Sequence, residues 1–440
     1  MVHSRKALLA ALPMAAAYPW AMEASSNMQK RQQSVEPPAR EPLFLSGRSN
    51  TSPLGSPVFD AEEQFVDVGP GSGHEFQSPG QGDIRGQCPG LNAASNHAYL
   101  PRSGIVSITD TITGLAEAFG MSPDLSLFLA VLSVAISGDP VAGTWSIGGE
   151  YQPTVPLLTG RATGIAGTHN QYESDASIVR GDAYLNGGFV GAFQMRSWEN
   201  FYAMGEEYTL DMAAAQSDYV TRWSILNNPY YFSAPFAGLV SPAAHDFVIN
   251  FMSNRSEENP GGVLTRSVLK DFFAVTGEPG SFVHNPGQER IPENWYRRSS
   301  TVQYNIPEVV ADVLVNNAMY PGIVRFGGNT GTTDSFTGVD VTDLTGGALN
   351  AQTLLEGNNA ACFFLQASQQ AIPDALDPAL GLVGSVANWA TQQLAPVADK
   401  LACPQLVDFE SSLFDQFPGA SYKAEGQNRP NGGFLGGLLG

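Results

Sequence analysis

The sequence predicts a mainly α-helical protein whose central part is one large domain. Helix-start signals, in which a cysteine or serine precedes a proline, stand at residues 88–89, 122–123 and 241–242. The apolar run 125–136 is long enough for a buried helix. Strand signals are scarce. The 440 residues exceed one average domain, but the motifs described below spread over the middle of the chain as one unit.

Residues 1–31 are expected to be a signal peptide with a possible pro-segment. Arg5 and Lys6 precede a mostly apolar stretch, 7–22, which is too short for a membrane span, and the dibasic pair Lys30-Arg31 follows it. We therefore expect a secreted, extracellular protein. The sequons at Asn50 and Asn254 are consistent with a glycoprotein.

Residues 32–79 are rich in Ser, Pro, Gly and Gln, with little apolar periodicity, which predicts a flexible N-terminal arm. The folded domain is expected over residues 80–305. Its predicted helices cover 105–119, 125–136 with Ser122 before it, one or two segments within 198–227, a segment from Ser241 to about 254, and 265–275, closed by Gly277.

Residues 306–440 are expected to form an irregular C-terminal extension with helical stretches near Cys362 and over 383–401, and a Gly-rich tail. Three cysteines in a secreted chain leave one unpaired. Cys362 and Cys403 can form a disulfide that clamps the extension, while Cys88 stays free.

The charge of the chain excludes two classes of partner. Lys and Arg number 22 against 42 Asp and Glu, which gives a net charge of −20. Such a protein repels nucleic acids and anionic membranes, so we expect neither as a partner.

Cys88 is the most informative residue of the chain. Pro89 suits the first position of a helix, so Cys88 is expected at the helix N-cap, facing free N–H groups and the positive helix end. These features lower the pKa of a thiol and predict a redox nucleophile or a metal ligand. The alternative is a buried, inert thiol.

Two segments carry a family resemblance. Residues 88–93 read Cys-Pro-Gly-Leu-Asn-Ala, and Asn96-His97 and Leu-Pro-Arg-Ser-Gly at 100–104 follow. Residues 173–182 begin with the acidic triplet Glu173-Ser174-Asp175 and continue through Ser177 and Arg180 to Asp182. In this order they resemble the fungal haem-thiolate peroxidases, the chloroperoxidase and unspecific peroxygenase family. Gln87 stands where the family usually has proline.

The resemblance implies a chloroperoxidase-like helical domain that binds haem b through Cys88 as the axial iron ligand. A thiolate ligand pushes electron density onto iron and favours cleavage of the O–O bond. The implied partners are hydrogen peroxide and a small apolar or aromatic substrate. The chain has no glycine-rich dinucleotide fingerprint, which argues against a reductase-dependent monooxygenase.

The acidic triplet also implies a divalent cation. If this stretch is helical, Glu173 and Ser177 lie on one face and, with the backbone carbonyl of Ser174, form a site for Mg²⁺ (or Mn²⁺). By resemblance this ion also contacts a haem propionate. The alternative is a solvated helix turn in which Asp175 pairs with Arg180.

The distal proton-transfer group departs from the family pattern. The arginine and glutamate of the long peroxygenases fall on Ala243 and Asn250, and the histidine of the shorter members falls on Ser174. Asparagine cannot transfer the proton, so Asp246, one helical turn before Asn250, and His169 are the candidate catalytic substitutes. The alternative for both is a structural role, Asp246 as a helix cap.

Tyr172 and Phe247 are expected to line the channel beside the haem, although aromatic residues at helical spacing are often plain core. His97 is expected to be a structural partner on the proximal side. The predicted function is that of a secreted haem-thiolate peroxidase or peroxygenase. The alternatives are a specialised oxidase of secondary metabolism with the same fold and a haem-binding protein with weak or no turnover.

Overall fold

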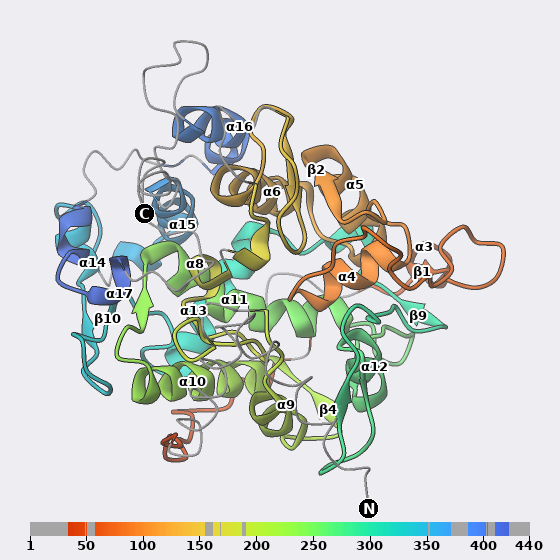
Figure 1. Ribbon diagram of the computed structural model, residues 1–440, viewed down its shortest axis with the longest axis horizontal. Coiled ribbons are helices and arrows are strands. Elements are labelled where there is room, and N and C mark those ends of the chain that lie inside the picture. Colours follow the sequence, from red (N-terminus) through yellow and green to blue (C-terminus); the bar gives the residue numbers. More distant parts are fainter. Residues whose placement is uncertain are drawn as a thin grey trace, which may run out of the picture.

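The computed structural model describes residues 34–48, 50, 58–154, 162–167, 169–186, 191–350, 353–370, 386–401, 403 and 410–421. The protein is mainly helical, as the sequence predicts (Figure 1). The α-helices are α3 (Ala61–Gln64), α4 (Pro89–Asn96), α5 (Ile108–Phe119), α6 (Pro123–Ser137), α8 (His169–Glu173), α9 (Met195–Tyr202), α10 (Leu210–Asn227), α11 (Pro235–Met252), α12 (Arg266–Phe272), α13 (Ile306–Met319), α14 (Val341–Leu344), α15 (Asn359–Gln370), α16 (Val386–Leu401) and α17 (Pro418–Ser421).

The strands are two or three residues long and join segments that are distant in sequence. Antiparallel pairs form between β1 (Phe65–Val66) and β9 (Trp295–Tyr296), β2 (Ile105–Ser107) and β3 (Thr144–Ser146), β4 (Glu207–Tyr208) and β6 (Leu264–Thr265), and β7 (Val275–Thr276) and β8 (Val283–His284). β10 (Gly327–Gly328) lies between β5 (Phe232–Ser233) and β11 (Thr337–Gly338).

Helix α11 is the centre of the molecule. It lies among the other helices in Figure 1 and packs against α8, α10, α13 and α15. Most of its side chains are buried. Because neighbours surround it, its apolar residues cover more than one face, as expected of a fully buried helix. One face of α11 forms a wall of the cavity described below, and another face meets α13.

Local sequence signals account for most helix ends. Ser107 and Asp110 form a capping box at the start of α5, and Gly120 ends that helix with a left-handed φ of 71°. Helix α6 begins after Ser122 as predicted. Helix α11 is a correction, because it begins at Pro235 and not at Ser241, so Pro242 lies inside it. Pro235 occupies the favoured first position, and burial on several sides offsets the backbone bond lost at Pro242.

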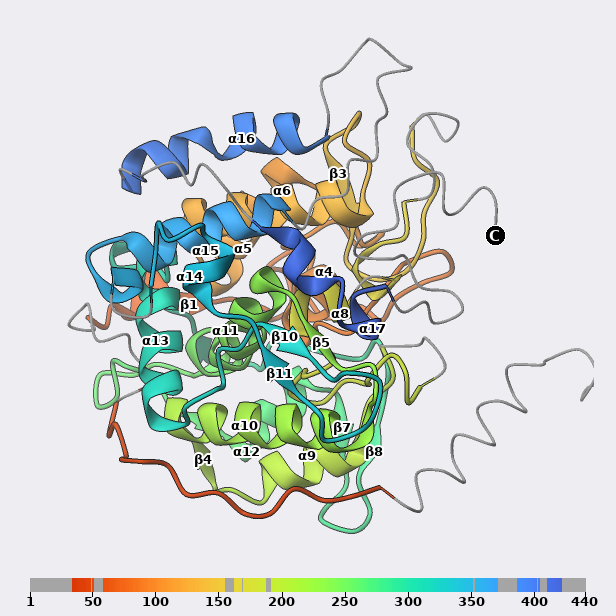
Figure 2. The same cartoon turned by 90° about the vertical axis from the view of Figure 1, so that its left-hand side faces the viewer.

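The segment 34–48, part of the expected flexible arm, is bound to the body as a strap. It runs along α10, where Figure 2 shows it in red. Arg40 pairs with Asp218 of α10 at 2.8 Å, and Arg48 pairs with Asp312 of α13 at 2.6 Å. Charge pairing, which apolar periodicity does not reveal, holds this segment.

Residues 58–79 also pack on the body, although the sequence predicts that folding begins near residue 80. Strand β1 pairs with β9, and Val66 and Val68 are buried in the main core. The rings of His74 and Tyr99 stack with centroids 3.9 Å apart. The helical domain therefore includes chain on the N-terminal side of the expected boundary.

Asn50, expected as a glycosylation site, is buried. Its Nδ2 donates to the Tyr208 carbonyl at 2.9 Å and to the Ser253 Oγ at 3.1 Å. A glycan needs this nitrogen exposed, so the fold as described leaves no room for one at Asn50.

The chain beyond residue 305 is part of the same core. Helix α13 packs on α10 and α11, α15 packs on α11, and α16 covers α6. The predicted disulfide is confirmed, since Cys362 and Cys403 are bonded and join α15 to the end of α16. No helix in the described ranges is long and apolar enough to cross a membrane.

Candidate active site

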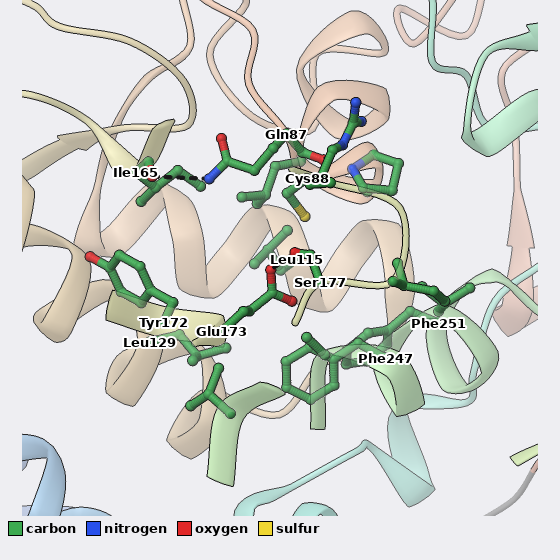
Figure 3. Close-up of a pocket in the computed structure, with 18 of the residues that line it drawn as sticks. Gln87, Cys88, Leu115, Leu129, Ile165, Tyr172, Glu173, Ser177, Phe247 and Phe251 are labelled. Carbon is green, nitrogen blue, oxygen red and sulfur yellow. Dashed lines mark hydrogen bonds between the residues drawn. The ribbon is translucent and has the colours of Figure 1, made fainter. Parts of the chain in front are cut away.

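A deep cavity opens between α4, α5, α6, α8 and α11. It has roughly 1200 Å³ of empty volume, part of it continuous with solvent, and its lining is mostly apolar. Cys88 stands on one wall, Phe247 and Phe251 lie on the opposite side, and Glu173 and Ser177 lie between (Figure 3). An apolar lining with a few polar groups is typical of cavities that bind small molecules or cofactors.

Cys88 is the N-cap of α4, as the sequence predicts, and the loop before it is fixed on several sides. Asn92 bridges the loop back to Gly86, donating to its carbonyl at 2.8 Å and accepting from its N–H at 2.9 Å. A Cβ on Gly86 would lie 2.1 Å from the Ile147 carbonyl oxygen, so only glycine fits there. The thiol therefore has a set position.

Gln87, the departure from the family pattern, adds two contacts to this loop. Its side-chain amide donates to the Ile165 carbonyl at 3.0 Å (Figure 3), and its backbone carbonyl accepts from the Arg180 Nε at 2.8 Å. The loop before the thiol is thus joined to two segments that lie far from it in sequence.

The electrostatics of the thiol correct the prediction from the helix start. Burial raises the pKa of Cys88 to about 11, although the N–H groups of Leu91 and Gly90 and the charge of Arg180 favour the thiolate. Desolvation outweighs the helix end, because the sulfur lies deep in the protein and is partly accessible where it opens onto the cavity. A coordinating metal ion would deprotonate this thiol outright.

The acidic triplet forms a tight turn rather than a helix. Helix α8 ends at Glu173, and Ser174 and Asp175 have left-handed φ values of 52° and 56°. The Ala176 N–H donates to the Glu173 carbonyl at 2.8 Å, and the Ser177 hydroxyl donates to the Glu173 carboxylate. The oxygens of Glu173 and Ser177 meet as expected, but through this turn.

The solvated alternative for this stretch is wrong. Asp175 is half-buried and accepts from the Ala183 N–H at 2.9 Å, while Arg180 is bound to the Gln87 carbonyl instead. The Ser174 hydroxyl donates to the Ser233 Oγ at 3.0 Å. Burial and the neighbouring Asp182 raise the pKa of Asp175 well above its ordinary value, so this carboxyl favours the protonated form.

Asp246 and Asn250 do not lie on the cavity, which corrects their expected place on the distal side. The face of α11 on the cavity carries Val240, Ala244, Phe247 and Phe251, spaced four, three and four residues apart, with Val248 and Met252 beside them. Asp246 instead accepts from the Asn316 Nδ2 at 2.8 and 2.9 Å, and Asn250 donates to Asp312 at 3.3 Å. Both point to α13, because their helical positions lie on another side of α11.

The other predicted site residues have three different outcomes. Tyr172 and Phe247 line the cavity, as their positions in the sequence suggest. His169 is the first residue of α8, but its side chain lies outside the described part of the structure. His97 is a structural partner, since its Nδ1 bonds to the His74 carbonyl at 2.6 Å and its Nε2 accepts from the Ile291 N–H.

Comparison with known proteins identifies the family. The sequence pattern of the family described as "Peroxidase, family 2", the fungal haem-thiolate chloroperoxidases and peroxygenases, matches residues 74–300. This match spans both signature segments and the walls of the cavity. The chain belongs to this family.

The relatives of this peroxidase are enzymes named for peroxide chemistry. A dothistromin biosynthesis peroxidase, dotB, of Dothistroma septosporum is 37% identical over 372 residues, 82% of this chain and 87% of that protein. An aromatic peroxidase, fscJ, of Fusarium equiseti is 34% identical over 388 residues, 83% and 88% of the two chains. An aromatic peroxygenase of Coprinellus radians is 30% identical over 228 residues, 49% and 84%.

The cavity of this peroxidase fits the haem that the family implies. The Cys88 thiol opens onto a largely apolar space, which suits an axial ligand and a flat macrocycle. Arg180, Glu173 and Ser177 add a charged and polar edge to the lining. The residues present therefore supply an iron ligand, apolar walls and a polar edge.

Two features of this site were not predicted from the sequence. Arg180 lies beside the thiol, although its place in the second signature assigned it no contact with the first. The apolar spacing of residues 240, 244, 247 and 251 marks the cavity face of α11. This spacing is the available signal that would have placed Asp246 and Asn250 elsewhere.

Proposed function

We propose that this peroxidase binds haem b through Cys88 and uses hydrogen peroxide to oxidise or oxygenate a small aromatic molecule in a biosynthetic pathway. The observation that carries the proposal is the Cys88 thiol, fixed by its loop at the wall of an apolar cavity. Two relatives that align with most of the chain are named as a biosynthesis peroxidase and an aromatic peroxidase, which supports the specialised role. Haem held by a thiolate supplies the oxidising centre.

The chain's own residues bind and orient the substrate. Phe247 and Phe251 offer ring faces opposite Cys88, and Val240 and Ala244 complete an apolar surface on α11. Such walls exclude water and favour a flat apolar substrate. The Tyr172 ring meets Phe236 edge-on at 5.9 Å and bounds another side.

Glu173 is the carboxylate that the described lining brings to the cavity. It supports two finer proposals. As a proton acceptor it would transfer the proton during peroxide cleavage. The cavity face of α11 cannot do so, since Val240, Ala244, Phe247 and Phe251 carry no titratable group. As a ligand it would hold Mg²⁺ or Mn²⁺ with Ser177 and the Ser174 carbonyl.

The two roles of Glu173 are distinguished by metal analysis of the purified holoprotein. The cation proposal rests on two side-chain oxygens, the Ser174 carbonyl and water, because the described residues hold no group of three or more His, Cys, Asp or Glu side chains that could bind a metal ion. Stoichiometric Mg²⁺ or Mn²⁺ that is lost in Glu173→Gln supports the ligand role. Unchanged metal content with slowed peroxide consumption supports the proton role.

Secretion is part of the proposal and rests on the charged start and the apolar stretch 7–22. Expression of the full chain in a fungal host should release into the medium a protein that begins after residue 22. Retention in the cell of a chain that keeps Met1 would refute this part.

The central experiment is the spectrum of the ferrous carbon monoxide complex. Thiolate ligation predicts a red-shifted Soret band that Cys88→Ala loses. Turnover of a chromogenic phenol with hydrogen peroxide then distinguishes an enzyme from a haem carrier, which the apolar α11 wall would also suit. A Cys88→Ala protein with an unchanged spectrum refutes the assignment.

A further inference from the structure

Arg180 is a buried cation at the wall that carries Cys88. Its side chain is 4% exposed and lines the cavity. Its Nε donates to the carbonyl of Gln87, the residue before Cys88, at 2.8 Å, although the two lie 93 positions apart in sequence. Arg180 thus holds the peptide group that leads into the thiol.

Glu289 offsets part of the charge of Arg180, but the two side chains are not hydrogen-bonded to each other. The Arg180 Nη2 lies 4.0 Å from the Glu289 Oε1, too far for a hydrogen bond, and has no hydrogen-bond partner among the described residues. Glu289 is itself 1% exposed. The Nε2 of His284 lies 4.0 Å from the same oxygen.

Burial of the charged Arg180 guanidinium is unfavourable unless a nearby negative group or aromatic ring compensates for its lost hydration. An isolated buried guanidinium carries a desolvation penalty of several kcal/mol that a pair 4.0 Å apart does not fully recover. The ring of Phe193, 5.3 Å from the guanidinium carbon, recovers part of it. The remaining interaction is with negative charge on the cavity side, where Cys88 and Glu173 stand.

We propose that Arg180 is the positioning residue of the Cys88 thiolate: it fixes the thiol loop through the Gln87 carbonyl, and its charge, partly offset by Glu289, limits how much electron density the sulfur donates to the haem iron. This inference rests on the proposed function, because it needs haem bound through Cys88. In this proposal Arg180 acts on the iron through the sulfur.

The inference predicts shifts of opposite sign in the haem reduction potential. Loss of the Arg180 charge favours ferric iron, so Arg180→Gln should lower the potential. Loss of the Glu289 charge lets Arg180 act more strongly, so Glu289→Gln should raise it. We expect a change of about tenfold in the ferric–ferrous equilibrium for each, which is about 59 mV for one electron.

The test uses purified holoprotein and spectroelectrochemical titration, with the Soret band of the carbon monoxide complex as a second readout. Arg180→Gln should lose part of the red-shifted thiolate band because the Gln87 carbonyl is released, whereas Arg180→Lys should keep a potential near the wild-type value. Arg196→Gln on α9 is the matched control, since Arg196 lies over the Trp223 ring and does not line the cavity. It should change neither readout.

Glu289→Gln keeps Arg180 and its bond to Gln87, so it tests the charge even if Arg180→Gln fails to fold. Potentials of both variants within the range of the Arg196→Gln control, or shifts of the same sign, overturn the inference. A wild-type protein without a thiolate Soret band refutes the proposed function instead, so the two failures are distinguishable.

Discussion

The side-chain amide of Asn250 is bound to Asp312 of α13, with 3.3 Å between Nδ2 and Oδ2, and does not face the cavity. Its Oδ1 accepts from the Arg298 Nη1 at 3.1 Å, so both ends of the amide are used. Asn250, expected from the sequence at the position of the family's distal glutamate, is therefore part of a buried polar network in this protein.

Asn250→Glu should destabilise the protein and leave peroxide cleavage no faster. The new carboxylate would be buried beside Asp312, and an uncompensated buried polar group costs about 1–3 kcal/mol. Urea denaturation measures this loss. Ala244→Glu is the matched variant, because Ala244 lies on the cavity. If Asn250→Glu accelerates peroxide consumption and Ala244→Glu does not, the orientation of α11 described above is wrong.

Asp246→Asn should stabilise the protein at alkaline pH. Burial and the neighbouring Asp312 raise the pKa of Asp246 well above its ordinary value, while Arg48 opposes this shift. The folded state therefore keeps a proton that the unfolded chain releases above about pH 4. The stability from this proton is complete below that pH and is lost as the pH rises through the folded-state pKa.

The measurement is the urea midpoint of wild type and Asp246→Asn from pH 4 to 8. The wild-type midpoint should fall more steeply with pH, because the amide oxygen of the variant still accepts from Asn316 without carrying a charge. The exposed control Glu62→Gln should follow the wild type. A variant less stable than wild type at pH 8 would contradict the shifted pKa.

Arg48→Met should cost far more stability than Arg40→Met. Arg48 is nearly buried and bonds to Asp312 and to the Asn316 Oδ1, both at 2.6 Å. Removing one partner of a buried ion pair costs about 3–5 kcal/mol. Arg40 is more exposed, and its partner Asp218 also pairs with Arg222, so its loss should cost less than about 1 kcal/mol. Equal losses in chemical denaturation would refute this ranking.

Reduction of the disulfide should destabilise the C-terminal part of the domain. Cys362 and Cys403 are 41 positions apart, and the loop-entropy model gives about 4 kcal/mol for such a loop. Thermal unfolding with and without reductant measures the effect, and Cys362→Ser should behave as the reduced protein does. Cys88→Ser should keep the full response to reductant, and a response lost in that variant would place the bond elsewhere.

Much of the fold follows from local sequence signals. Ser122 with Pro123 marked a helix start that the structure confirms, because caps act within one turn. The helix predicted over 105–119 begins only at Ile108, because residues 105–107 form strand β2 and Ser107 caps the helix. The start of α11 was missed, since Ser241-Pro242 has the form of a start signal and only the packing around the helix shows that Pro242 is internal.

The candidate site was predicted unevenly for the same reason. Cys88 and the meeting of Glu173 with Ser177 are properties of short segments. The pKa of Cys88 depends on how deeply the thiol is buried, and the direction in which Asp246 points depends on α13, 60 or more residues further along. Packing between distant segments decides both the pKa of Cys88 and the direction of Asp246. A short motif or a helix-start signal carries no information about such packing.

The ion pair between Arg48 and Asp312 also sets an order of assembly. The two residues are 264 positions apart, so Arg48 leaves the ribosome long before α13 exists. Strand β1 likewise cannot pair until β9, 230 residues later, has been synthesised. Contacts of such sequence separation slow folding. The N-terminal part of the body is thus synthesised first but completed among the last, and Arg48 stays without its partner Asp312 until most of the chain has been made.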